Sequence, residues 1–259
     1  MSAPWLLNFG ARREAPVRLF CLSSAGSGAA MYRSWRDALP ADVDVCAVQL
    51  PGRENRLRET PIASMAALAD TLAVELRRWM DRPFALFGHS MGAQLAFELA
   101  RRLHAADGPR PGLLMVSARR APQLPDQEPP LHTLSDDDLL AEVGRRYGGI
   151  PAEVLQHRDL LDLLLPGLRA DLTAIETHRH VDAPPLRCPI VAYGGTADTR
   201  AAPAQLDGWA VHTSAAFRRR CFAGGHFYLQ DDTVRGALLA DVAQGLRALQ
   251  PLRAPEAAG

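Results

Sequence analysis

The sequence predicts an α/β protein with a mostly parallel central sheet flanked by helices. Short, near-continuous apolar runs alternate along the chain with longer helical patterns, as in units whose strands are buried on both faces. One stretch, 121–185, has no convincing strand pattern and is bordered by prolines, which favour extended backbone. We therefore predict a core made of residues 1–120 and 186–250, with a helical lid inserted at 121–185.

Six runs of apolar or β-branched residues are the strand candidates. They are residues 17–23, 43–50, 83–87, 113–117, 189–193 and 217–222. Between them, residues 64–80 and 91–103 repeat leucine at i, i+4 spacing, which is typical of amphipathic helices that connect parallel strands. A last helix is expected over 232–249. It precedes a tail of Pro, Ala and Gly at 251–259, which we expect to be flexible.

Capping signals predict two helices inside the insertion. Ser135 precedes acidic residues and suits an N-cap, and Gly148-Gly149 suits a helix stop. Pro151 suits the first position of the second helix. The second helix carries more leucine than one narrow stripe needs: Leu160, Leu161, Leu163, Leu164, Leu165 and Leu168. This surplus fits either ordinary core packing or a lid whose underside lines an acyl pocket.

Charge and composition exclude several function classes. The 29 basic and 29 acidic residues cancel, so the long-range field of a dedicated nucleic-acid or anionic-membrane binder is missing. No apolar run approaches the roughly 18 residues of a membrane span, and the first ten residues lack the basic segment of a signal peptide. We therefore expect a cytoplasmic protein that binds neither nucleic acid nor membrane.

The four cysteines, Cys21, Cys46, Cys188 and Cys221, are widely scattered and form no C-x-x-C pattern. Each lies in or beside a predicted strand. A disulfide framework or a zinc site needs closer spacing, so we expect buried free thiols and no metal site.

Residues 88–92 read GHSMG, a G-x-S-x-G pattern between a predicted strand and a predicted helix. The bare pattern occurs by chance in roughly one chain in twenty of this composition, so its context decides. A sharp turn between strand and helix needs small neighbours, and it raises the serine hydroxyl above the carboxyl ends of the strands. Ser90 is therefore the candidate nucleophile.

A nucleophilic serine needs a histidine to take its proton and a carboxylate to orient that histidine. The expected order along the chain is Ser, acid, His. Asp198 and His226 each follow a glycine pair in a loop at the end of a predicted strand, so they are the candidate acid and base. Asp207 is the fallback acid. His89 belongs to the turn itself, and the other six histidines lack the strand-end glycines, so we expect them to be exposed or satisfied.

Two backbone donors are also needed to bind the oxyanion. One is expected from the N–H of Met91, directly after the nucleophile, and the other from the loop after an early strand. Residues 23–28, SSAGSG, form that loop, and their small side chains let the backbone approach a substrate carbonyl. A phosphate cradle is the alternative, but the G-x-x-x-x-G-K-S/T pattern is missing and the chain has no lysine.

Together these motifs resemble the external, or type II, thioesterases that accompany polyketide and nonribosomal peptide assembly lines. The resemblance covers the whole chain apart from the last few residues. It is carried by Ala25-Gly26, Gln49-Leu50-Pro51-Gly52-Arg53-Glu54 with Arg56, residues 88–92, Leu134-Ser135-Asp136, Gly148-Gly149, Arg169-Ala170-Asp171, Cys188-Pro189-Ile190 and Gly224-Gly225-His226-Phe227. The Pro-Gly-Arg-Glu run together with the serine turn is quite specific.

The resemblance implies an α/β-hydrolase fold with a flexible helical lid. It also implies a catalytic triad of Ser90, Asp198 and His226, with an oxyanion hole made by the backbone N–H groups of Ala25 and Met91. The implied reaction is hydrolysis of unwanted acyl groups from the phosphopantetheine arm of acyl or peptidyl carrier proteins. The chain itself is expected to bind no cofactor and to be a monomer.

Five positions depart from the family pattern. Ser24 stands where similar proteins usually carry an aromatic residue or histidine, and Ser27 where they carry a second glycine. Thr199 replaces a common proline, and His178 and His180 replace aromatic residues late in the lid. We expect Ser24 and Ser27 to change the geometry of the loop and the polarity of the pocket. None of the five positions belongs to the triad.

The charged motifs leave two questions open. The Arg53/Glu54 pair either braces the active-site loop or forms a surface ion pair. Carrier proteins are usually acidic, so an arginine run can dock one or can simply lie on a solvated surface. The candidate runs are Arg119-Arg120, Arg145-Arg146 and Arg218-Arg219-Arg220.

Three other functions share some of these features. A general carboxylesterase or lipase has the same triad but prefers oxygen esters. An acyltransferase passes the acyl group to a thiol or alcohol instead of water. A carrier-protein binding module without catalysis is the alternative from a different class, although an intact set of catalytic positions argues against it.

Overall fold

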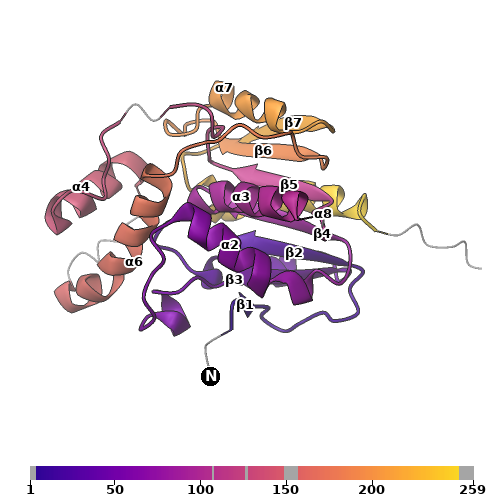
Figure 1. The fold of residues 1–259 in the computed structure, drawn as a ribbon, viewed down its shortest axis with the longest axis horizontal. Coiled ribbons are helices and arrows are strands. Elements are labelled where there is room, and N and C mark those ends of the chain that lie inside the picture. The colour runs from indigo at the N-terminus through magenta and orange to yellow at the C-terminus, as the bar shows by residue number, and fades with distance from the viewer. Residues whose placement is uncertain (1–3, 107, 126–127, 149–156, 251–259) are drawn as a thin grey trace, which may run out of the picture.

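The computed structural model describes residues 4–106, 108–125, 128–148 and 157–250. Its centre is a seven-stranded sheet with the strand order β1-β3-β2-β4-β5-β6-β7 (Figure 1). The strands are β1 (Leu6–Leu7), β2 (Val17–Leu22), β3 (Val43–Val48), β4 (Phe84–His89), β5 (Leu113–Ser117), β6 (Ile190–Gly195) and β7 (Phe217–Phe222). The α-helices are α1 (Trp35–Ala38), α2 (Met65–Glu75), α3 (Met91–Ala105), α4 (Asp136–Tyr147), α6 (Arg158–Glu176), α7 (Pro203–Leu206) and α8 (Asp232–Arg247).

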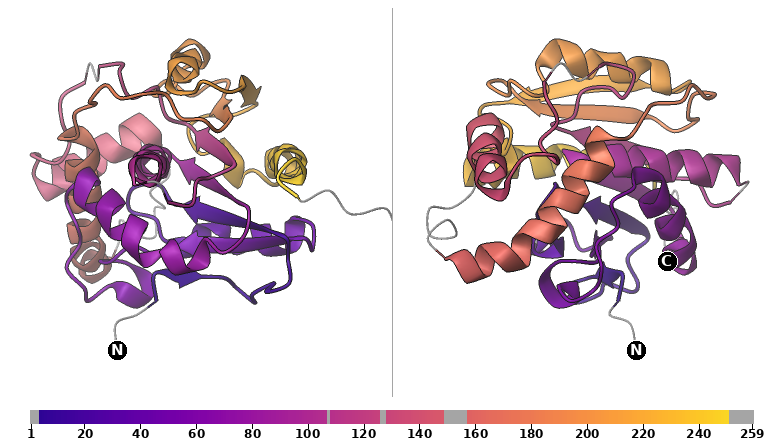
Figure 2. Two further views of the ribbon diagram at one scale, coloured as in Figure 1. Left: turned by 45° about the vertical axis from the view of Figure 1, so that its right-hand side comes forward. Right: turned by 60° about the vertical axis from the view of Figure 1, so that its left-hand side comes forward.

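Helices cover both faces of the sheet (Figures 1 and 2). On one face, Leu72 of α2 and Leu99 of α3 share a buried apolar cluster with Phe20 of β2. On the other face, Val242 of α8 shares a second cluster with Leu19, the neighbour of Phe20 in the same strand. Successive side chains of a strand point to opposite faces, so both faces of the sheet are covered. The predicted α/β class is confirmed.

All six predicted strands are present, and their ends differ from the predicted ones by at most two residues. They pair in parallel throughout. The sequence analysis missed β1, which pairs antiparallel with β3 through Leu6 and Val48. A strand of two residues is too short to show a periodic pattern, so it gives no signal of its own.

The predicted helix over 64–80 is divided in the structure. The Ser64 hydroxyl accepts from the N–H of Ala67 over 3.4 Å and caps α2, but the helix ends at Glu75. A short 3-10 helix, Arg77–Trp79, continues the chain with the tighter hydrogen-bond pattern that often closes an α-helix. The predicted final helix ends two residues early, at Arg247.

The described residues between 121 and 185 form α4 and α6 and contain no strand. Ser135 caps α4 as predicted, because its hydroxyl accepts from the N–H of Asp138 over 3.3 Å. Gly148 follows the last residue of α4 with φ +65°, a conformation that favours glycine. The predictions for Gly149, Pro151 and residues 251–259 lie outside the described residues.

The cysteines differ in burial. Cys21, Cys46 and Cys188 are buried free thiols, whereas Cys221 is only partly buried because β7 is an edge strand. Burial raises the pKa of Cys188 to about 11, so this thiol stays protonated and unreactive at neutral pH.

Among the residues that the structure describes, we find no helix with the length and apolar character needed to cross a lipid bilayer.

Candidate active site

Ser90 lies in a sharp turn between the end of β4 and the start of α3. Its backbone has φ +54° and ψ −114°, a combination that residues with side chains rarely adopt. The Ser90 N–H donates to the carbonyl oxygen of Ser117, at the end of β5, over 2.8 Å and holds the turn. The strained turn raises the hydroxyl beyond the carboxyl ends of the strands.

Both glycines of the G-x-S-x-G pattern are needed because backbone segments approach closely. A Cβ atom on Gly88 would lie 2.0 Å from the carbonyl oxygen of Gly92. A Cβ atom on Gly92 would lie 2.1 Å from the carbonyl oxygen of Leu22. Neither position can take a side chain unless the backbone moves. The start of α3 therefore packs directly against β2 and β4, and this packing positions Ser90.

Ser90, His226 and Asp198 form one chain of hydrogen bonds. The Nε2 atom of His226 lies 2.9 Å from Oγ of Ser90, and its Nδ1 atom lies 2.9 Å from Oδ2 of Asp198. The side chains of His226 and Asp198 are only 5% and 1% exposed. The three residues come from loops that follow β4, β6 and β7, so the parallel sheet brings them to one edge.

Close contact between the last two loops brings the acid to the base. A Cβ atom on Gly195 would lie 2.2 Å from the carbonyl oxygen of Gly225, so the loops touch through bare backbone. The N–H groups of Arg200 and Ala201 donate to Oδ1 of Asp198 over 2.8 and 3.2 Å. These bonds orient the carboxylate and leave its other oxygen for the imidazole.

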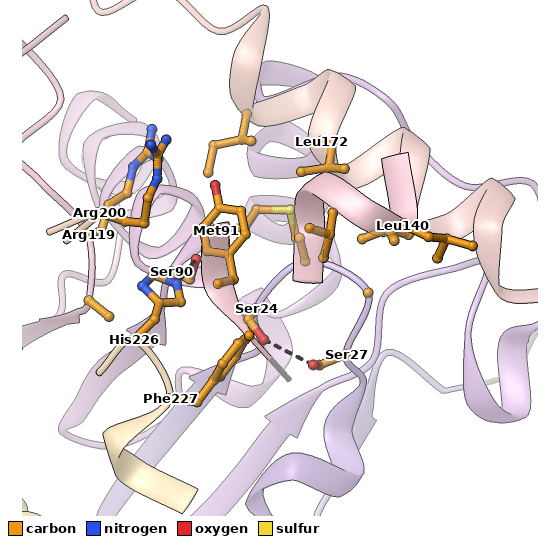
Figure 3. A pocket seen from close by; sticks show the side chains of 18 of the residues that line it. Ser24, Ser27, Ser90, Met91, Arg119, Leu140, Leu172, Arg200, His226 and Phe227 are labelled. Carbon is orange, nitrogen blue, oxygen red and sulfur yellow. Dashed lines mark hydrogen bonds between the residues drawn. The ribbon is translucent and has the colours of Figure 1, made fainter. Parts of the chain in front are cut away.

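Ser90 and His226 line a cavity of about 310 Å³ (Figure 3). Much of its apolar wall comes from α4 and α6, through Leu140, Val143, Leu161, Leu165, Leu168 and Leu172. Figure 3 shows Arg119 and Arg200 beside His226, with Leu140 on the opposite side of the cavity. A cavity that joins an apolar wall to a few polar groups is suited to an acyl chain attached to a polar reacting centre.

The comparisons with known proteins identify the family of the chain. A family model described as "Thioesterase domain" matches residues 17–243. The chain belongs to the thioesterase family. It is 37% identical over 227 residues to the gramicidin S biosynthesis protein GrsT of Aneurinibacillus migulanus, and the match covers 88% of each chain.

Two solved structures are similar to this thioesterase over most of its length. The type II thioesterase BorB from the borrelidin biosynthetic cluster is 39% identical with a TM-score of 0.85, covering 95% of this chain and 99% of its own. The thioesterase RedJ of the prodiginine pathway in Streptomyces coelicolor is 41% identical with a TM-score of 0.84, covering 91% and 92%. The resemblance and the α/β-hydrolase fold expected from the sequence are confirmed.

Asp207, the fallback acid, lies outside the hydrogen-bonded chain of this thioesterase and forms an ion pair with Arg219 of β7. Three other histidines have side-chain partners of their own, as expected: His132 contacts Glu176, His178 contacts Glu98 and His212 contacts Gln123. Of the two candidate acids, it is Asp198 that contacts His226, and His226 in turn contacts Ser90.

His89 is buried beside the imidazole of His226, with 5.4 Å between the ring centroids. Its Nδ1 atom lies 2.9 Å from Oγ of Ser117, which lies 2.7 Å from the phenol oxygen of Tyr228. Burial, and next the positive charge of His226, hold the pKa of His89 well below its usual range. His89 therefore stays neutral and does not oppose a positive charge on the neighbouring imidazole.

The sequence analysis did not identify two residues of the thioesterase site, Tyr147 and Arg200. The Tyr147 ring lies 5.0 Å from the His226 ring, and the Arg200 guanidinium lies 5.6 Å from the centre of the Tyr147 ring. For Tyr147, the one signal available in the sequence was its position directly before Gly148, where the helix was predicted to end. Arg119 lines the cavity, and Arg120 is only 7% exposed, so this run does not fit the solvated surface that was one of its two interpretations.

The Arg53/Glu54 pair also needs correction. Arg53 is buried and forms its ion pair with Asp171 of α6, with 2.6 Å between Nη1 and Oδ2. Glu54 instead accepts from the N–H of Ala30 over 3.1 Å. The sequence could not reveal the Arg53 partner, because the two residues are 118 positions apart. Of the two interpretations, the surface ion pair is wrong, and Arg53 connects the core to α6.

Proposed function

We propose that this thioesterase is a serine hydrolase that releases unwanted acyl groups from the phosphopantetheine arm of acyl or peptidyl carrier proteins. The observation that carries the proposal is the hydrogen-bonded chain from Asp198 through His226 to Ser90, which opens into a largely apolar cavity. Similarity to proteins named for gramicidin S and borrelidin biosynthesis supports a role beside a nonribosomal peptide or polyketide assembly line.

In the first step, Nε2 of His226 takes the hydroxyl proton as Oγ of Ser90 attacks the thioester carbonyl. Asp198 accepts from the Nδ1–H of His226, which keeps Nε2 facing the serine and stabilises the imidazolium that forms. The tetrahedral intermediate then collapses and the carbon–sulfur bond breaks. The thiol of the phosphopantetheine arm has a pKa of about 8.5, so the sulfur leaves readily as a thiolate. The thiolate then takes the proton from His226, which restores the neutral imidazole.

The oxyanion of this intermediate is bound by the backbone N–H groups of Met91 and Ala25 in the proposed mechanism. Met91 is the first residue of α3, where N–H groups have no intrahelical acceptor and the helix dipole favours negative charge. Ala25 lines the same cavity from the loop after β2. One such donor typically contributes a factor of about 10² to 10³ to kcat.

In the second step, water replaces the thiol next to His226. The imidazole takes a proton from this water, which attacks the acyl-serine ester, and the proton returns to Oγ of Ser90 as the carboxylic acid leaves. Water is the acceptor in this cycle, which distinguishes hydrolysis from transfer of the acyl group to a second thiol or alcohol.

Mass spectrometry of a panel of acyl-carrier proteins, beside the matching free acyl-pantetheine thioesters, tests the proposal. We expect loss of the acyl group from the carriers, and only background turnover with Ser90→Ala. Faster cleavage of matched alkyl esters would indicate a carboxylesterase, and transfer to an added thiol would indicate an acyltransferase. Failure of a fluorophosphonate probe to label Ser90 would favour a binding module without catalysis.

The acidic carrier protein is proposed to dock beside α4, where Arg145 is exposed and Val143 lines the cavity. Arg145 pairs with Glu142 of its own helix, a carboxylate that is 30% exposed. Arg218 and Arg220 are weaker candidates because both form ion pairs with the carboxylate of Asp241, which is only 4% exposed. We expect Arg145→Glu to slow hydrolysis of carrier-bound thioesters several-fold and to spare free acyl-pantetheine. Arg187→Glu is the control, since Arg187 is exposed just before β6, at the other end of the strands.

A further inference from the structure

Asp171, on α6, connects this helix to the loop that carries Ala25. One carboxylate oxygen, Oδ2, accepts from the backbone N–H of Gly26 over 2.8 Å and from Nη1 of Arg53 over 2.6 Å. The other oxygen accepts from Nη2 of Arg53 over 2.8 Å. Arg53 also donates to the carbonyl oxygen of Ser27 over 3.3 Å. The carboxylate and the guanidinium together hold the backbone of the loop on both sides of Gly26.

The backbone of α6 lies close to the core on the same face. A Cβ atom on Gly167 would lie 2.7 Å from the carbonyl oxygen of Gly52, directly before Arg53. Leu168 lies against Gly26, where an added Cβ would be 3.1 Å from its Cδ1 atom. Gly26 itself has φ +72°, so the loop takes a conformation that needs support from its surroundings.

We infer that Asp171 is a positioning residue for the oxyanion hole, acting through Gly26 on the N–H of Ala25, the residue directly before it in the loop. This inference rests on the proposed function, which assigns Ala25 as an oxyanion donor. Its consequence is that the donor is in place only while α6 lies against the core, since the same carboxylate holds both the loop and the helix.

The buried ion pair has an electrostatic reason in this arrangement. Asp171 and Arg53 are only 1% and 5% exposed, so an unpaired charge on either would be costly. A carboxylate alone beside the loop would also oppose the negative charge that develops on the substrate oxygen. The guanidinium of Arg53 neutralises the carboxylate through two parallel hydrogen bonds, which keeps the acceptor for Gly26 and removes the opposing charge.

Asp171→Ala tests the inference with p-nitrophenyl acetate as the substrate. We expect kcat to fall about 10- to 100-fold with little change in KM. A displaced donor weakens binding of the transition state more than it weakens binding of the ester substrate. The inhibition constant of an alkyl trifluoromethyl ketone, whose adduct with serine carries an oxyanion, should rise by a similar factor. Asp171→Asn keeps an acceptor for Gly26 and should lose less.

Glu176→Gln is the matched control. Glu176 is a second carboxylate of α6 that accepts backbone N–H groups, from Leu131 and His132 at 2.9 and 3.0 Å, but these residues lie outside the oxyanion loop. We expect this variant to keep kcat and the affinity for the ketone. A loss of stability without a catalytic effect in the Asp171 variants, or an equal catalytic effect in Glu176→Gln, would overturn the inference.

A pair of double variants keeps the test valid if Asp171→Ala does not fold. Arg53→Met with Asp171→Asn removes both charges and keeps an acceptor for Gly26, whereas Arg53→Met with Asp171→Leu removes both charges and the acceptor. Equal kcat values and ketone affinities in the two would contradict the inference. The p-nitrophenyl ester reports on the oxyanion hole even if carrier-bound thioesters are not substrates, so failure of the proposed function is recognised separately.

Discussion

The ring of Tyr147, the last residue of α4, lies 5.0 Å from the imidazole of His226 at an angle of 59°. This contact connects the helical segment between β5 and β6 directly to the proposed general base. The guanidinium of Arg200 lies on the same tyrosine ring, two residues after Asp198. The side chain from α4 therefore lies between two loops of the active site.

We expect Tyr147→Ala to lower kcat/KM about 3- to 10-fold, because an aromatic contact of this kind contributes about 0.5–1.5 kcal/mol. Tyr147→Phe keeps the ring and should retain activity. The measurement is steady-state hydrolysis of a short acyl-pantetheine thioester. If the phenylalanine variant loses as much as the alanine variant, the phenol hydroxyl is the important group, and the ring contact does not explain the loss.

The two candidate acids give a paired prediction. Asp198→Asn keeps the shape of the side chain but no longer holds the imidazole in the correct tautomer, so kcat should fall on the order of 10³- to 10⁴-fold. Asp207→Asn removes a partly exposed ion pair with Arg219, and we expect less than about a twofold change. Steady-state kinetics on one thioester compares both variants. Near-normal turnover by Asp198→Asn would assign the acid role to another residue.

The fold was predictable where burial on both faces forces an apolar sequence pattern. Strands such as β5 are covered by helices on each side, so their residues are apolar throughout and their ends are marked by polar or glycine residues. The same reasoning located Ser90, Asp198 and His226, because the carboxyl ends of parallel strands meet at one edge. Strand β1 was missed because two residues at the sheet edge show no such pattern.

The cavity wall was less predictable because it depends on contacts between distant segments. Arg53 and Asp171 lie in motifs that the sequence analysis quoted, yet their pairing joins the loop after β3 to α6. No local periodicity records such a contact. The surplus leucines illustrate the same limit. Leu161 and Leu165 belong to a small apolar cluster beside α4 and also line the cavity. Core packing and lining of a pocket, the two interpretations of these leucines, therefore both apply.

His212 provides a prediction about pH and stability. Burial, and next the charge of His180, lower the pKa of His212 to about 4, and its Nε2 lies 2.6 Å from Oε1 of Gln123. Histidine in the unfolded chain has a pKa near 6.5. The unfolded chain therefore binds this proton more readily, so the free energy of unfolding should fall as the pH drops from about 6.5 to about 4.

His212→Gln removes this titration and keeps a donor for Gln123. We expect its free energy of unfolding, measured by urea denaturation at several pH values, to fall less steeply between pH 6.5 and pH 4 than that of the unmodified protein. His157→Gln, at an exposed position before α6, is the control and should leave the slope unchanged. Parallel curves for all three proteins would show that His212 does not contribute to the slope.

The length of the acyl chain should depend on the wall that α4 and α6 supply. Leu140 lines the cavity on the side away from His226 (Figure 3), so Leu140→Trp should fill this part and leave the triad in place. We expect kcat/KM to fall about 10-fold or more for long acyl-pantetheine thioesters and to change little for the acetyl thioester, since one methylene contributes about 1–3 kcal/mol in such pockets. Leu163→Trp is the matched control, because Leu163 is 54% exposed on α6 and points away from the apolar wall. An equal loss for acetyl and long chains with Leu140→Trp would mean that this side of the cavity does not hold the acyl chain.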